Sequence, residues 1–116
     1  MRILTSCVAA AILGSFAFAA AACENPALVP IPDGKTSTLE QMLAGQKDVK
    51  AYQAKMNDYL ACVDAEAAAQ GEQAPNEYKA LMVNRHNAAV AEMEGVAAAF
   101  NDQIKAYKAA NPAPAK

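Results

Sequence analysis

The chain has little of what a β-rich or aromatic-cored domain needs. It contains no tryptophan, only 6% aromatic residues and only 5 glycines among its 116 residues, whereas alanine is abundant. This composition is typical of a helical protein. The length allows one small domain, near the lower end of the size range at which a single core is self-sufficient.

A strong excess of charge is also absent. Ten Lys and Arg residues are set against 12 Asp and Glu residues, for a formal net charge of −2. A mildly acidic chain of mixed charge argues against nucleic acid as a partner. After the N-terminal segment, no run of about 18 apolar residues occurs, so we expect no membrane span in the processed protein.

Reactive side chains are few. Beyond residue 22 the sequence has one histidine, one serine and one arginine, namely His86, Ser37 and Arg85. We expect Ser37 to cap a helix, which leaves a Ser-His-acid triad without a nucleophile. The sequence has no CxxC, no glycine-rich phosphate loop and no HExxH. We therefore predict that the protein is not an enzyme and carries no cofactor.

Residues 1–22 have the features of a signal peptide. A basic residue, Arg2, precedes an apolar stretch over about residues 7–19, and the stretch ends in a run of small residues, Ala19 to Ala22. Cleavage there would remove Cys7 and export the rest to the periplasm or the outside of the cell. The alternative is an N-terminal helix that is retained.

Cys23 and Cys62 remain after cleavage. In an oxidising compartment, two cysteines favour a disulfide. The alternative is a lipoprotein acylated at Cys23. Lipoprotein signals usually carry a branched aliphatic residue three positions before the cysteine, where this chain has Ala20, and acylation would leave Cys62 as a lone thiol.

Residues 23–36 are predicted to form an extended, proline-rich arm. Pro26, Pro30 and Pro32 exclude a helix, and Asp33-Gly34 indicates a turn. The extended chain from Cys23 to Ser37 reaches about 46 Å, and a helix from Ser37 to Cys62 spans about 37 Å. The arm can therefore run antiparallel along the first helix and close the disulfide. We expect Leu28, Val29 and Ile31 to pack into the groove between the helices.

The remaining sequence predicts an all-α fold, an antiparallel hairpin of two helices at about 37–70 and 75–110. Ser37 with Glu40 fits a capping box, Gly71 suits a left-handed C-terminal residue, and Pro75 suits the first turn of the second helix. A short connection makes the helices antiparallel. Residues 111–116 are expected to form a disordered tail.

Apolar residues repeat every seven positions in both helices, which indicates a coiled-coil-like seam. The predicted seam consists of Met42, Gly45, Val49, Tyr52, Met56, Tyr59 and Val63, facing Met82, His86, Ala89, Met93, Val96 and Phe100. Folding about the connection pairs residues whose numbers sum to about 145. This register places Gly45 against Phe100, where a small residue faces a large one, and Tyr59 against His86.

Six short stretches are similar to a group of uncharacterised exported proteins from proteobacteria. They are Ile31-Pro32-Asp33-Gly34, Thr38-Leu39-Glu40-Gln41-Met42, Val49-Lys50-Ala51-Tyr52, Tyr59-Leu60-Ala61-Cys62, Arg85-His86-Asn87 and Phe100-Asn101. The resemblance covers most of the chain after residue 22. It implies a shared structure with an IPDG-containing arm, and it implies no activity.

His86 admits three interpretations. The favoured one is a structural histidine that hydrogen-bonds the hydroxyl of Tyr59 across the seam. A second is a Cu(I) site with the thioethers of Met82 and Met93, since imidazole and thioether are suitable ligands for that ion. The third is an exposed histidine at a partner surface. Methionines at heptad spacing usually fill a core, and this favours the structural interpretation.

The sequence therefore predicts a small exported, non-enzymatic helical protein, a structural or binding component of the cell envelope. Its partner would be an unknown envelope protein or a second copy of itself. A periplasmic chaperone-like or stress module, with an exposed apolar strip, is one alternative. Copper handling through His86 and the methionines is the other.

Overall fold

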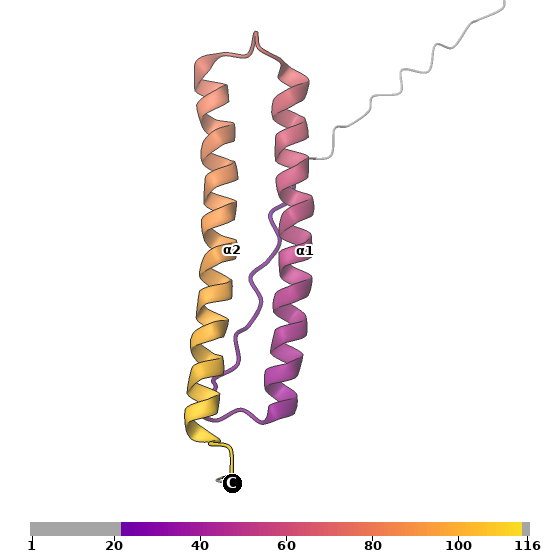
Figure 1. Ribbon diagram of the computed structural model, residues 1–116. Coiled ribbons are helices and arrows are strands. Elements are labelled where there is room, and N and C mark those ends of the chain that lie inside the picture. The colour runs from indigo at the N-terminus through magenta and orange to yellow at the C-terminus, as the bar shows by residue number, and fades with distance from the viewer. Residues whose placement is uncertain (1–21, 115–116) are drawn as a thin grey trace, which may run out of the picture.

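The computed structural model describes residues 22–114 and shows an antiparallel hairpin of two long helices (Figure 1). Helix α1 spans Leu39–Gln70 and helix α2 spans Asn76–Ala110. Residues 22–114 contain no strand, so the predicted all-α hairpin is confirmed for this part of the chain. The predicted signal peptide, with Cys7, lies outside the described residues except for its last position. Residues 111–114 continue from α2 without regular secondary structure.

Helix α1 begins one residue later than the capping prediction implied. Thr38, not Ser37, is the N-cap: its side chain accepts from the backbone N–H of Gln41 at 3.2 Å, and the Gln41 side chain accepts from the Thr38 N–H at 2.8 Å. Ser37 belongs instead to the preceding turn, because its N–H donates to the carbonyl of Asp33 at 2.9 Å. Ser37 with Glu40 and Thr38 with Gln41 both satisfy the capping-box pattern. Because the turn after Asp33 includes Ser37, the helix is capped by Thr38.

Gly71 ends α1 with a φ of 68°, which a residue with a side chain rarely adopts. The positive φ agrees with the prediction, but its ψ of −172° is not the left-handed helical value. The Gly71 N–H still donates to the carbonyl of Ala68 at 3.1 Å. Pro75 is the N-cap of α2 rather than its first helical residue. The chain thus reverses over residues 71–75.

The seam between the helices forms the core. All the predicted seam residues are buried except Tyr59, His86 and Met93, which are half-buried. Tyr52, Met56 and Val63 are the largest fully buried side chains. Phe100 lies next to Gly45, as the register predicted.

The arm follows the seam on one side and crosses from α1 to α2 (Figure 1). At one end, Cys23 is disulfide-bonded to Cys62 with a Cα–Cα distance of 5.7 Å. At the other end, the Gly34 N–H donates to the side-chain oxygen of Gln103 at 2.9 Å. The predicted disulfide and the antiparallel course of the arm are therefore confirmed.

Two of the three predicted arm contacts are present. Val29 and Ile31 are partly buried against the core. Leu28 is 65% exposed, so its predicted burial is wrong. In an extended segment neighbouring side chains point to opposite sides, and burial of Val29 leaves Leu28 facing outward.

Two glycines let the arm approach the helices closely. A Cβ at Gly34 would lie 2.7 Å from the backbone nitrogen of Tyr107, so a side chain there would push the arm away from α2. A Cβ at Gly45 would lie 2.6 Å and 2.7 Å from the ring of Pro32 and 3.4 Å from Phe100. Gly45 is thus small mainly to accept Pro32 of the arm, whereas the sequence had suggested Phe100.

We predict that Gly45→Ala destabilises the protein by about 1 kcal/mol. Overpacking against Pro32 costs about 1–3 kcal/mol, and the gain in helix propensity offsets about 1 kcal/mol of it. Urea unfolding of the oxidised protein measures the difference. Gly95→Ala is the matched control, since a Cβ there meets nothing within 4 Å. It should stabilise the same fold by about 0.5–1 kcal/mol.

A second substitution isolates the arm contact. In a Pro32→Ala background the ring is gone, and Gly45→Ala should then become neutral or stabilising. An equal loss of stability in both backgrounds would show that Pro32 is not the cause.

Candidate functional site

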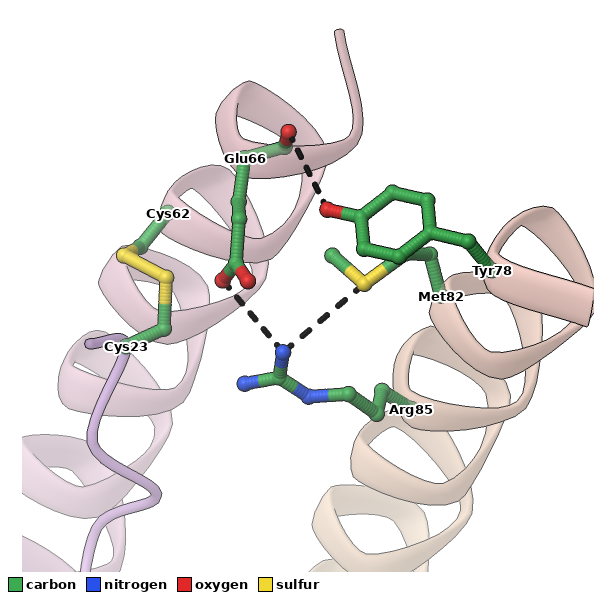
Figure 2. A network of polar contacts seen from close by, with 6 residues as sticks. All are labelled: Cys23, Cys62, Glu66, Tyr78, Met82 and Arg85. Atoms are coloured by element: carbon green, nitrogen blue, oxygen red, sulfur yellow. Dashed lines mark hydrogen bonds and ion pairs between the residues drawn. A yellow bond between two sulfur atoms is a disulfide. The ribbon is translucent and has the colours of Figure 1, made fainter. Parts of the chain in front are cut away.

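Polar side chains that join the two helices gather near the hairpin turn, beside the disulfide (Figure 2). Nη1 of Arg85, on α2, donates to Oε2 of Glu66, on α1, at 3.3 Å, and also lies 3.8 Å from the sulfur of Met82. The hydroxyl of Tyr78 donates to the backbone carbonyl of Glu66 at 3.4 Å. These contacts fix the relative position of α1 and α2 between the disulfide and the turn.

Arg85 also lies over the ring of Tyr59, with its Cζ 5.9 Å from the ring centroid. This distance is typical of a cation–π contact. Tyr59 is the largest cause of a raised pKa of the Arg85 guanidinium; burial opposes it, and Glu66 adds a smaller increase. The Arg85 side chain is therefore always charged. Its contacts with Tyr59 and Glu66 of α1 hold the two helices together.

His86 does not pair with Tyr59, so the predicted hydrogen bond between them is wrong. Its Nδ1 lies 3.0 Å from Oδ1 of Asp64, and the two side chains are 39% and 63% exposed. Seven-residue spacing places His86 near the seam, but its position on α2 turns it toward the side away from Arg85. Arg85, the next residue back along α2, takes the place beside Tyr59 instead.

A groove of about 310 Å³ lies between the helices at this level. Val63 and Met82 are buried and form part of its lining, and Tyr78 lies at the side nearer the turn. Asp64 and His86 line it as well. The groove is thus largely apolar, with the polar pair of Asp64 and His86 at its edge.

The residues proposed for Cu(I) are not brought together. Met82 and Met93 are 11 positions apart on one straight helix, about 16 Å along its axis. The Met82 sulfur faces Arg85, a cation, and His86 faces Asp64. Within residues 22–114 no three His, Cys, Asp or Glu side chains form a cluster that could hold a metal ion. The geometry does not favour a metal site at His86.

Ser37 is remote from His86. It lies beside the start of α1, at the open end of the hairpin, whereas His86 lies in the third of α2 nearest the turn. The imidazole–carboxylate pair of His86 and Asp64 thus has no serine within reach. It is a close polar contact between two side chains at the surface.

A partly buried hydrogen bond crosses the middle of the hairpin. The hydroxyl of Tyr52 donates to Oε1 of Glu92 at 2.7 Å. Burial, followed by the hydrogen bond and the nearby charge of Glu92, raises the pKa of Tyr52 to about 12. Tyr52 was predicted to lie in the seam, whereas its partner Glu92 was not predicted. The predicted register could have identified Glu92, since the residue numbers 52 and 92 sum to about 145.

Comparison with known proteins gives no relative: no protein family, curated protein or solved structure matches the chain. The resemblance to exported proteobacterial proteins stays a prediction. Among the residues that the structure describes, neither helix is apolar enough over sufficient length to cross a bilayer.

We predict that Tyr52 makes the fold sensitive to alkali. Its pKa is raised in the folded state, so its contribution is fully present below about pH 10 and is lost as the pH rises toward 12. The free energy of unfolding should fall by about 2 kcal/mol over this interval because of Tyr52. Urea unfolding at pH 8 and pH 11.5 measures the fall.

Tyr52→Phe should be less stable than the parent at pH 8 and should lose this part of the alkaline decline. Tyr78→Phe leaves the Tyr52–Glu92 pair intact and should keep it. An alkaline decline in Tyr52→Phe as steep as in the parent would assign the effect to other groups.

Proposed function

We propose that this chain is an exported, non-enzymatic protein of the cell envelope that acts by binding or by structural support. One observation carries the proposal: Cys23 and Cys62 are joined in a disulfide that ties the arm to α1. Structural disulfides persist in oxidising compartments and are rare in the cytosol. Cys23 also follows directly on the small residues that end the predicted signal peptide.

The same bond bears on the lipoprotein alternative. Acylation would form a thioether on the Cys23 sulfur, and a disulfide uses the same atom. The two states therefore exclude each other. The arm contacts of Val29, Ile31 and Gly34 support the disulfide, because they already hold the arm along the seam.

A non-enzymatic role is supported by how the polar side chains are used. Arg85 pairs with Glu66, His86 with Asp64, and Tyr52 with Glu92, in each case across the two helices. Pairs of this kind hold a hairpin together. The hairpin then presents a stable surface of fixed shape, which is what a binding or supporting protein needs.

Expression of the full-length sequence in a Gram-negative bacterium, followed by fractionation and intact-mass analysis, tests the export. We expect a chain in the periplasm that begins at Cys23 and reacts with an alkylating reagent only after reduction. A lipid mass on Cys23 in the membrane fraction, or a reduced chain in the cytosol, would overturn it. Cys62→Ser is the control: it should expose Cys23 to alkylation, whereas a lipoprotein would remain anchored.

Complementation of a deletion strain tests the non-enzymatic role, with survival under envelope stress such as detergent as the readout. His86→Asn keeps a hydrogen-bonding side chain but abolishes acid–base chemistry, and we expect full complementation. Paired substitution of Cys23 and Cys62 by Ser should reduce complementation together with stability. Loss of function in a His86→Asn protein of unchanged thermal stability would point to chemistry at His86.

A further inference from the structure

The hairpin has two sides, and the arm covers only one of them. Arm residues lie against Asp48, Tyr52 and Lys55 of α1, and Gly34 lies against Gln103 of α2. Successive helical residues are about 100° apart, so the positions on the other side of the seam follow directly. They form a surface that we call the back face: Gln46, Gln53, Leu60 and Ala67 of α1, and Val83, Val90, Ala97 and Ile104 of α2.

The two rows of the back face carry no charge, although Asp64 and Lys79 line the same groove as Ala67 and Val83. None of its eight residues is charged, in a chain with 19% charged residues. Its residues repeat every seven positions on each helix and so form two straight rows, as in helices that pack against other helices. Val83 is 58% exposed, and Leu60, Val90, Ala97 and Ile104 are half-buried.

Two further exposed leucines extend this surface toward the open end of the hairpin. Leu39 and Leu43 are 57% and 54% exposed. Leu39, seven positions before Gln46, continues the α1 row, and Leu43 lies at the edge of the back face. Three of the five large apolar side chains that are most exposed, Leu39, Leu43 and Val83, therefore lie on this side.

We propose that the back face binds a second copy of this chain, with the two hairpins side by side and both turns at the same end. The product is a four-helix bundle in which α2 of each copy packs against α1 of the other. This inference goes beyond the proposed function, since export and the disulfide do not depend on it.

Charge complementarity at the edges supports this arrangement. The observed contacts Tyr52–Glu92 and Gly45–Phe100 show that residues at one level have numbers summing to about 145. Lys79 is thus level with Asp64 of the second copy, and Glu94 is level with Lys50 of the second copy. Opposite charges meet at both edges.

The apolar side chains match in the same arrangement. Val83 is level with Leu60 of the second copy, and Ile104 is level with the space between its Leu39 and Leu43. Apolar side chains thus face one another near both ends of the rows.

The area is sufficient for a stable dimer. The rows extend over about 32 Å, from residue 83 to residue 104, and two helices side by side are about 20 Å wide. Treated as a flat rectangle, the face of each copy has an area of about 640 Å², or about 1,300 Å² for the two copies together. Specific protein interfaces bury about 1,200–2,000 Å².

Sedimentation equilibrium of the oxidised protein, purified from the periplasm after expression of the full sequence, tests the proposal. We expect the mass of a dimer. Val83→Lys should weaken the dimer at least about tenfold, because it places a charge in the apolar interface. Leu81→Lys is the matched control: it makes the same change two positions away at a side chain that is 54% exposed, on the arm side of α2, and should leave the dimer intact.

A charge exchange tests the orientation. Lys50→Glu should weaken the dimer because it then faces Glu94, and addition of Glu94→Lys should restore it. Circular dichroism and the melting temperature confirm that each variant is folded. A monomer at all concentrations up to about 1 mM would overturn the proposal, whether or not it binds unfolded protein. A dimer that Val83→Lys and Leu81→Lys weaken equally would overturn it as well.

Discussion

The arm tied down by the Cys23–Cys62 disulfide is the constraint on which this fold depends. Two helices that meet along one seam leave the seam open on both sides, and the arm closes one side with Val29, Ile31 and Pro32. A disulfide between residues 39 positions apart stabilises the folded state by about 4 kcal/mol on the chain-entropy view. Gly34 of the arm and Gly45 of α1 are positions where the lack of a side chain lets the arm and the helices approach closely.

Different groups cover the seam on the two sides of the disulfide. From the start of α1 to Cys62 the arm lies over it. At the level of the disulfide, Arg85 reaches across from α2 and pairs with Glu66 (Figure 2). Its guanidinium also lies over the ring of Tyr59. A cation with several partners can fill this place because its long side chain also packs against apolar groups. The polar cluster thus continues the role of the arm.

The uncovered side has a different character. Its rows lack charge and carry exposed valine and leucine, while charges of both signs lie along its edges. Exposed apolar side chains gathered on one face are typical of a surface that binds another protein. The arm would cover one side of the seam and a second copy the other. The proposed dimer would thus cover the side of the seam that the monomer leaves open.

The sequence by itself determined the two helices, their antiparallel arrangement, the register of Gly45 with Phe100 and the disulfide. These depend on heptad spacing, proline positions and chain length, all of which are local or one-dimensional quantities. Only the tertiary structure decided which of two adjacent residues makes a given contact. Thr38 rather than Ser37 caps α1, Val29 rather than Leu28 faces the core, and Arg85 rather than His86 meets Tyr59. Neighbouring residues have nearly the same pattern in sequence, but they point in different directions in space. The contacts of the folded chain therefore choose between them.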